Sequence, residues 1–114
     1  MTAPERSAAQ RAEALAAALA ARRERADLRA ALKGRRVTGA AVLDGASDNQ
    51  VWAGVRVSWL LESLPGVGPV RAERVMADLG IAPSRRLQGL GEHQWAALRT
   101  YLLGREQRGR GLES

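Results

Sequence analysis

A glycine- and proline-rich segment at residues 64–69 has the composition of an anion-binding turn. It reads Leu-Pro-Gly-Val-Gly-Pro, and helix-forming residues follow it. Glycines let backbone N–H groups approach an anion closely, and a helix N-terminus adds unpaired donors and partial positive charge. Such a combination binds phosphate without reading a base. We predict phosphate contacts in this turn and on the helix after it, at Gly66, Val67, Gly68, Arg71 and Arg74.

The spacing in this segment differs from two well-known nucleotide motifs. A P-loop needs Lys-Ser or Lys-Thr after its glycines, and a dinucleotide fingerprint needs a strand before them. Neither is present. An ordinary turn between two helices remains the alternative interpretation.

A second candidate lies at residues 83–91, where two adjacent arginines precede another glycine turn. We expect Ser84 to cap a turn of helix that carries the arginines. A solvated loop with surface arginines is the alternative. The candidate contacts are Arg85, Arg86, Gln88, Gly89 and Gly91.

A basic run follows the back half of the N-terminal segment, from residue 22 to residue 36. A solvated helix face with ion pairs four residues apart explains such a run equally well. We treat its end as a secondary phosphate contact, at Lys33, Arg35 and Arg36.

The residue inventory gives little support for catalysis or for a metal. The chain has no cysteine and a single histidine, His93, and its acidic residues are scattered. General acid–base catalysis needs paired groups, and a metal needs several ligands. We therefore expect no enzyme activity, no cofactor and no metal. A reducing cytoplasm fits the lack of cysteine, and we see neither a membrane span nor a secretion signal.

The charge balance points to a polyanionic partner. The 114 residues carry a formal net charge of +6, with a sequence pI of about 11.3. Nucleic acid is the first candidate and an acidic membrane surface the second. All basic residues except Lys33 are arginine, a choice that suits phosphate but that GC-rich coding also produces.

These candidate sites need helices to position them, and the pattern is helical throughout, which predicts an all-α fold. Residues 2–33 read as one long helix, with Thr2 and Glu5 at capping-box spacing and Gly34 as its stop. Its two leucine stripes lie about half a turn out of phase. We expect the second half to dock on the core while the first projects as an arm.

The remaining elements are short. Helices are predicted over residues 39–43, 59–64, 70–79 and 92–103, the first two capped by Thr38 and Ser58. Pro69 suits a first helical position. Trp59 and Trp95 are expected in the core. We divide the chain into an arm at residues 1–36, a helical core at residues 37–103 and a basic, disordered tail at residues 104–114.

The chain resembles the integration host factor of actinobacteria, the mycobacterial and streptomycete type. The matching stretches include Leu-Leu-Glu-x-Leu-Pro-x-Val-Gly at residues 60–68 and Ile-Ala-Pro-Ser-Arg-Arg-Leu-x-Gly-Leu-Gly at residues 81–91. The second stretch is the more specific. The resemblance covers most of the chain and weakens before Ala12 and after Leu103.

The resemblance implies a long N-terminal helix on a compact core with a helix-two-turns-helix motif. It also implies binding to double-stranded DNA with little sequence preference, DNA bending and condensation, nucleoid organisation, and help to a recombinase in phage integration. By the same route Arg85 and Arg86 become the likeliest contacts. The family pattern has basic residues where this chain has Pro69 and Gln88, and each lost phosphate contact weakens binding.

Three other functions stay open from the sequence. The motif also serves ribosomal RNA, so a structured-RNA or ribosome-associated protein is the first. A DNA-processing enzyme of the glycosylase type is the second, although the chain is short for a catalytic domain. An interaction protein whose alanine-rich arm pairs with a partner helix is the third. We expect a monomer when DNA is absent.

Overall fold

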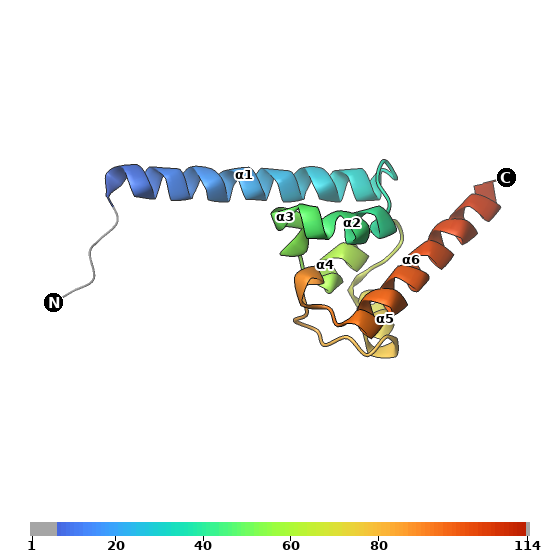
Figure 1. Cartoon of the computed structure of the whole chain (residues 1–114). Coiled ribbons are helices and arrows are strands. Elements are labelled where there is room, and N and C mark those ends of the chain that lie inside the picture. The colour runs from blue at the N-terminus through green and yellow to red at the C-terminus, as the bar shows by residue number, and fades with distance from the viewer. Residues whose placement is uncertain (1–6, 114) are drawn as a thin grey trace.

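The computed structural model describes residues 7–113, and in this part of the chain every regular element is a helix (Figure 1). Two long helices, α1 and α6, leave a core of short ones in different directions. The only strand-like pairing described is a single bridge between Arg56 and Arg86. The all-α prediction is confirmed. The elements are α1 (Ala8–Lys33), α2 (Gly39–Gly45), the 3-10 helix η1 (Ala46–Asp48), α3 (Gln50–Ala53), α4 (Val57–Glu62), α5 (Pro69–Asp78), the 3-10 helix η2 (Leu87–Gly89) and α6 (Glu92–Glu113).

Helix α1 begins with a capping box formed by Ser7 and Gln10. The Ser7 hydroxyl accepts from the Gln10 amide at 3.1 Å, and the Gln10 side chain accepts from the Ser7 amide at 2.8 Å. The two backbone N–H groups, which have no acceptor within the helix, thereby each gain a hydrogen-bond partner. The cap predicted at Thr2 and Glu5 lies outside the described residues.

The end of α1 places an arginine where glycine is usual. The Arg36 amide donates to Ala31 and the Arg35 amide to Leu32, which is the Schellman pattern. Arg35 has φ of 61°, whereas Gly34 keeps a negative φ of −83°. The helix ends at Lys33 as predicted, but the residue in the left-handed region is one position later than expected.

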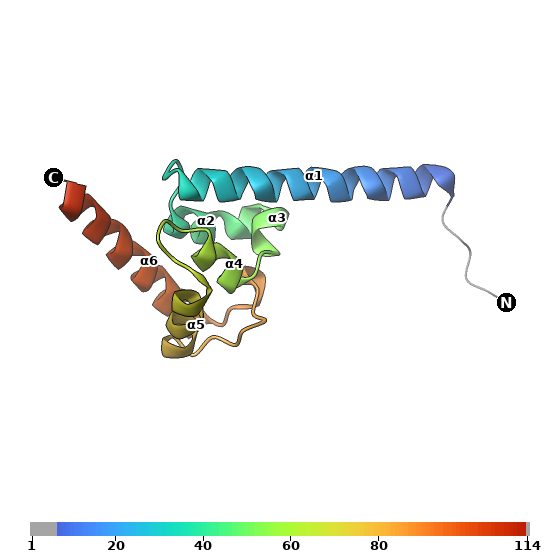
Figure 2. The same cartoon turned by 180° about the vertical axis from the view of Figure 1, so that it is seen from behind.

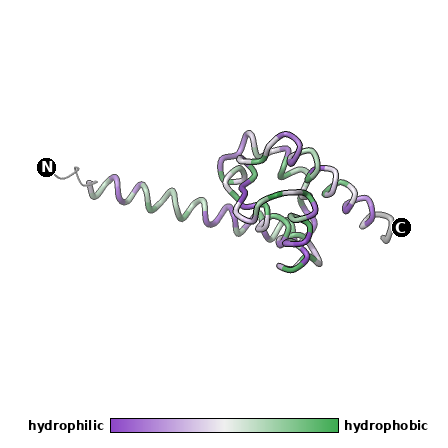
Figure 3. The backbone as a smooth tube through the Cα atoms, turned by 90° about the horizontal axis from the view of Figure 1, so that it is seen from below, coloured by the Kyte–Doolittle hydropathy of each residue, from purple (hydrophilic) through white to green (hydrophobic). Residues whose placement is uncertain are grey.

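Only the second half of α1 packs on the core. Leu28 and Leu32 are 5% and 1% exposed, whereas Leu15 and Leu19 are 61% and 48% exposed. Figure 2 shows the N-terminal half of the rod extending well beyond the other helices. Figure 3 shows hydrophilic and hydrophobic stretches alternating along this free part. The two stripes therefore have the different environments that their phase difference predicted.

The core is built from aliphatic side chains of every element except α3, which has no buried residue. Leu60, Leu61 and Val57 of α4 are fully buried, and Leu98 and Leu102 of α6 close against them. Trp59 is half-buried against this cluster, under the guanidinium of Arg29 at 5.4 Å. Trp95 is 37% exposed, so the prediction that it is a core residue is wrong.

Two of the short helices, α2 and α3, begin at polar side-chain caps. Thr38 caps α2 as predicted, and the Asn49 side chain caps α3. Helix α4 begins at Val57, not after Ser58, and has no side-chain cap. Instead, the Val57 amide donates to Arg85 at 2.9 Å. The start of α4 is set by a loop far along the chain, which explains why the Ser58 prediction was wrong.

Helix α6 continues past Gly104 to Glu113, so the predicted disordered tail is wrong for residues 104–113. Two side chains of this extension hold it to the core. Arg105 donates to the Pro65 carbonyl, and the Glu106 carboxylate accepts from the Ala40 amide at 3.2 Å. The predicted division at residue 103 therefore falls inside a helix.

Candidate nucleic-acid interface

The glycine segment before α5 forms a type II turn. The Val67 amide donates to the Leu64 carbonyl at 3.2 Å, and Gly66 has φ of 75°. Proline before a glycine with positive φ is the sequence that this turn type requires. Val67 anchors the turn to the core, since its side chain is only 6% exposed. Val67 therefore offers a ligand its backbone and not its side chain.

The turn leads into a helix N-terminus that no side chain caps. Gly68 is the N-cap residue of α5 and Pro69 is its first residue, as predicted. Because the cap is glycine, the first amides of α5 keep their unpaired donors and the positive end of the helix dipole. A shallow hollow of about 380 Å³ lies over them. Its lining is Gly66, Gly68, Pro69, Val70, Arg71 and Arg74.

Arg71 and Arg74 stand on the same exposed part of α5 as this hollow. Residues three apart on a helix are neighbours, so both guanidinium groups can reach an anion or its neighbours. The structure thus brings together the predicted residues of the first site. An uncapped helix N-terminus, two glycines and two arginines are suited to a phosphate group.

The second candidate loop differs from the prediction in its local structure. Residues 83 and 84 form a turn, and the two arginines after it precede the 3-10 helix η2. Arg86 has φ of −100° and ψ of 161°, which is extended. The prediction that Ser84 caps a helix carrying Arg85 and Arg86 is therefore wrong. Both arginines are nevertheless exposed.

Pairing with the segment before α4 holds this loop. The Leu87 amide donates to the Val55 carbonyl at 3.0 Å, and Arg56 bridges to Arg86. The Arg86 guanidinium donates to the Gly54 carbonyl at 2.5 Å, and that of Arg85 donates to Gly89 at 3.1 Å. Both arginines of the loop therefore donate to backbone carbonyls, Arg85 within the loop and Arg86 to the segment before α4.

Arg56 is a residue that sequence reasoning did not select for the site. The bridge places it beside Arg86, and it is exposed like both arginines of the loop. Like charges side by side repel each other, and an anion relieves that repulsion. The alternation of Val55, Arg56 and Val57 was the available signal, since it puts the valines inward and the arginine outward.

The rest of the second loop is positioned by Gln94. Its side-chain oxygen accepts from the Gly91 amide at 3.2 Å, and its nitrogen donates to the Gly80 carbonyl at 2.8 Å. Gln94 thereby joins the two ends of the loop. Gln88 and Gly89 lie between them in η2 and are exposed.

The three basic residues at the end of α1, which the sequence predicted as a secondary contact, have different surroundings. Lys33, Arg35 and Arg36 are all exposed. The Lys33 ammonium donates to the Glu62 carbonyl at 3.3 Å. Arg35 lines a different cavity, beside Arg105.

Within the described residues, the structure shows neither a metal-ligand cluster nor a membrane-spanning helix. No three histidine, aspartate or glutamate side chains of residues 7–109 gather as metal ligands would. None of the helices in this part of the chain has the length and apolar character needed to cross a membrane.

Comparison with known proteins identifies the fold and the relatives. Residues 32–101 match the family model of the S13-like H2TH domain. The chain is 48% identical to the integration host factor of Streptomyces coelicolor over 98 residues, covering 86% of this chain and 92% of the relative. Identity to the integration host factor of Mycobacterium tuberculosis is 47%, covering 86% and 93%.

A solved structure of sIHF bound to an 8-base-pair palindromic DNA is also similar. Its TM-score is 0.71 at 47% identity, covering 75% of this chain and 96% of that one. The sequence relatives, the domain model and the similar solved structure therefore agree with one another. This chain belongs to the integration host factor family represented in Streptomyces and Mycobacterium, and its core is an S13-like H2TH domain.

Proposed function

We propose that the chain is a nucleoid-associated protein that binds double-stranded DNA through its phosphate backbone with little sequence preference. The observation that carries this function is the hollow at the N-terminus of α5, where uncapped amides, Gly66 and Gly68 meet Arg71 and Arg74. The exposed group Arg56, Arg85 and Arg86 supplies a second cationic surface. Contacts of this kind position a duplex without reading its bases.

The DNA-bound relative supports a duplex as the polyanion. Bending and condensation of DNA, and assistance to a site-specific recombinase, are part of the proposal because two separate cationic surfaces can hold a duplex at more than one place. We place the protein in the cytoplasm on the nucleoid, as a monomer when DNA is absent. The proposal includes no catalytic step and no cofactor.

The test is a salt titration of binding to a short fluorescent DNA duplex, repeated with unrelated sequences and with an RNA duplex. We expect affinity to fall steeply with salt and alike for every DNA sequence, and to be weaker for RNA. Preference for the RNA duplex, or absence of binding at low salt, would overturn the proposal.

Replacing Arg85 and Arg86 by alanine is the matched mutational prediction. If each arginine meets one phosphate, the slope of log K against log salt becomes shallower by about two units. Arg11→Ala, on the projecting arm, is the control and leaves the slope unchanged. Because Arg86 also bonds to Gly54, circular dichroism must show that the double variant is folded. An unchanged slope removes both arginines from the interface.

A further inference from the structure

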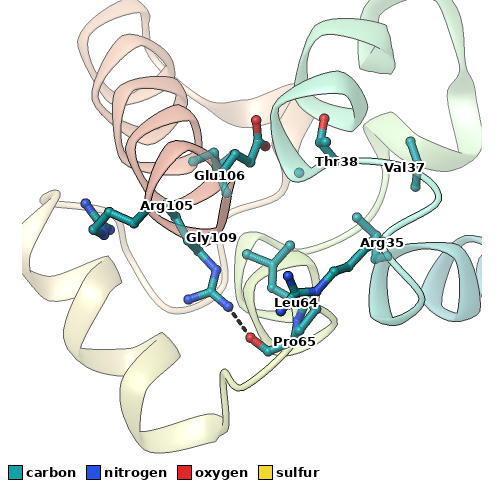
Figure 4. A pocket seen from close by; sticks show the side chains of 12 residues that line it. Arg35, Val37, Thr38, Leu64, Pro65, Arg105, Glu106 and Gly109 are labelled. Carbon is teal, nitrogen blue, oxygen red and sulfur yellow. Dashed lines mark hydrogen bonds between the residues drawn. The ribbon is translucent and has the colours of Figure 1, made fainter. Parts of the chain in front are cut away.

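A larger cavity, of about 500 Å³, lies between the end of α1, the start of α2, the type II turn and the C-terminal half of α6 (Figure 4). It is separate from the hollow over α5, since the two share no lining residue. Its volume falls within the range of about 300–1,000 Å³ that is usual for small-molecule sites. The sequence did not predict it, because it depends on α6 continuing past Gly104.

The walls of the cavity are mostly apolar. Leu32 of α1, Leu64 at the start of the turn and Leu102 of α6 line it but are only 1%, 6% and 1% exposed, so the apolar surface within reach of a ligand belongs mainly to Val37 and Pro65. Each of the three leucines also belongs to the core cluster, so these walls are firmly held. A preformed apolar surface of this kind favours a hydrocarbon chain or ring over water.

Charged groups at the mouth of the cavity are predominantly cationic. Arg35, Arg105 and Arg108 line it, and Glu106 is the one acidic residue among the lining. The Glu106 carboxylate accepts from the Ala40 amide at 3.2 Å. Figure 4 shows it turned toward α2 and away from Arg105. The carboxylate is therefore engaged with α2, and the arginines dominate the charge that a ligand would meet.

Arg105 is the best-placed of these cations for recognising an anion. Its side chain is half-buried, and one of its N–H groups donates to the Pro65 carbonyl. A guanidinium has five N–H donors in a planar fork, so this single carbonyl leaves donors for a second acceptor. Partial burial strengthens a hydrogen bond between guanidinium and carboxylate, and the planar fork matches a carboxylate with two parallel bonds.

We propose that this cavity binds a small amphipathic anion, an acyl or aryl carboxylate, with its apolar body against Val37 and Pro65 and its carboxylate on Arg105 and Arg108. The combination is specific in two respects. An inorganic anion cannot use the apolar walls, and a neutral apolar molecule cannot use the arginines. Neither residue of the carboxylate site belongs to the proposed DNA contacts.

Nuclear magnetic resonance of the full, ¹⁵N-labelled chain tests the proposal, with octanoate as the probe. We expect saturable shifts of the Gly39 and Gly109 amides and of the Arg105 side-chain N–H, since Gly39, Gly109 and Arg105 line the cavity. Acetate and 1-octanol, which each lack one half of the ligand, should bind at least about tenfold more weakly. Equal shifts with 1-octanol, or none with octanoate up to about 10 mM, would overturn it.

Two variants separate this site from general attraction of anions to a basic protein. Arg105→Gln and Arg108→Gln should each weaken octanoate binding, and the exposed Arg108 serves if Arg105→Gln fails to fold. Arg74→Ala, which removes a cation from the hollow over α5, should leave octanoate affinity unchanged. A loss with Arg74→Ala as large as that with Arg108→Gln would show non-specific anion binding and contradict the proposal.

Discussion

Gly66, in the type II turn, and Gly68, at the start of α5, have different tasks although they lie two positions apart. Gly66 has φ of 75°, a conformation that costs other residues about 1–2 kcal/mol, and a Cβ there would meet nothing within 4 Å. Gly68 has φ of −95°, which any residue adopts, and a Cβ there would also be in open space. Backbone conformation therefore explains the first glycine, whereas the second is the N-cap residue of α5 and has open space around its Cβ position.

This difference makes a prediction that separates folding from binding. Gly66→Ala should lower the free energy of unfolding by about 1 kcal/mol because of its backbone conformation. Gly68→Ala should cost less than about 1 kcal/mol, because alanine is a poorer N-cap residue than glycine, and should weaken DNA binding by the folded protein, because its methyl group would stand in the hollow over α5. Urea denaturation and the duplex titration measure the two effects. Unaltered DNA affinity of Gly68→Ala would contradict close approach of the backbone to phosphate.

A second residue-scale prediction concerns the ion pair between Arg99 and Asp44. Arg99 Nε donates to Asp44 Oδ1 at 2.9 Å and Nη2 donates to Oδ2 at 3.0 Å. This hydrogen bonding lowers the pKa of Asp44 from its ordinary value of 3.8, and a small desolvation effect opposes it. A lowered pKa stabilises the folded state above the ordinary value, and the stabilisation is lost as pH falls through the lowered pKa.

We therefore expect Asp44→Asn to be less stable than the parent chain at neutral pH by a small amount. The difference should shrink below about pH 4 and vanish below the lowered pKa. Both side chains are partly exposed, at 38% and 44%, so salt should reduce the difference as well. Thermal unfolding of both chains across pH measures it. A difference that persists in acid would assign the loss to something other than this carboxylate.

At the scale of elements, α6 departs most from what its sequence indicates. Gly104 and Gly109 favour an end to the helix, yet the helix passes through both. A Cβ at Gly104 would have only an ordinary contact, at 3.5 Å from the Arg108 guanidinium. Arg105 and Glu106 provide the compensating contacts to Pro65 and Ala40.

Substitution of Gly104 tests this account of α6. Gly104→Ala should raise the free energy of unfolding by about 0.5–1 kcal/mol, because alanine has the higher helix propensity and the space is open. Gly104→Pro should break the helix and reduce the helical signal in circular dichroism. A disordered tail would instead leave both variants like the parent chain, which would contradict the structure of residues 104–113.

The sequence predicts those elements whose signals are local. The turn at Gly66, Pro69 at the start of α5 and the Thr38 cap each depend on residues within a few positions, and all three are confirmed. Most of the wrong predictions depend on distant partners, whereas Trp95 is exposed on α6 with the Arg99 guanidinium 5.9 Å from its ring. Glu106 contacts a residue 66 positions away, and Arg105 one 40 positions away, so no local pattern could place them. The cavity and the pairing of Arg56 with Arg86 also depend on residues that are distant in sequence, so the sequence did not predict them.

In the candidate site, too, the features with local signals were predictable and those that depend on distant residues were not. The hollow over α5 was predictable because glycine, proline and two arginines are close in sequence. The second surface was predicted in its residues but not in its backbone, since the extended conformation of Arg86 comes from a segment some thirty positions earlier. The adjacent arginines and the glycine turn after them supplied these residues, the family resemblance supported Arg85 and Arg86, and only the fold supplied Arg56.

For the whole molecule, the two long helices determine the shape. The radius of gyration is 16.9 Å and the extents are 62 × 28 × 26 Å. A compact chain of this length has a radius of about 13 Å. The excess arises chiefly because the first half of α1 and the end of α6 lie outside the core.

Removal of residues 1–20 should therefore change the shape but not the stability. We expect the free energy of unfolding to stay within about 0.5 kcal/mol, because Leu15 and Leu19 bury little. Small-angle scattering should give a smaller radius of gyration. Leu28→Ala, on the packed half of the same helix, is the contrast and should cost about 2–4 kcal/mol. Strong destabilisation by the truncation would mean that the arm has contacts in solution that the monomer lacks.

The division of α1 into a packed and an unpacked half also affects how fast its amide protons exchange with solvent. Amide protons of the unpacked half depend only on helix–coil equilibrium for their protection, and an isolated helix of that length is marginal in water. Those near Leu28 and Leu32 are released only when the core opens. One unbroken helix therefore carries fast-exchanging amides at its beginning and slow-exchanging amides at its end, and its N-terminal half is free to unwind and re-form while the rest of the molecule stays folded.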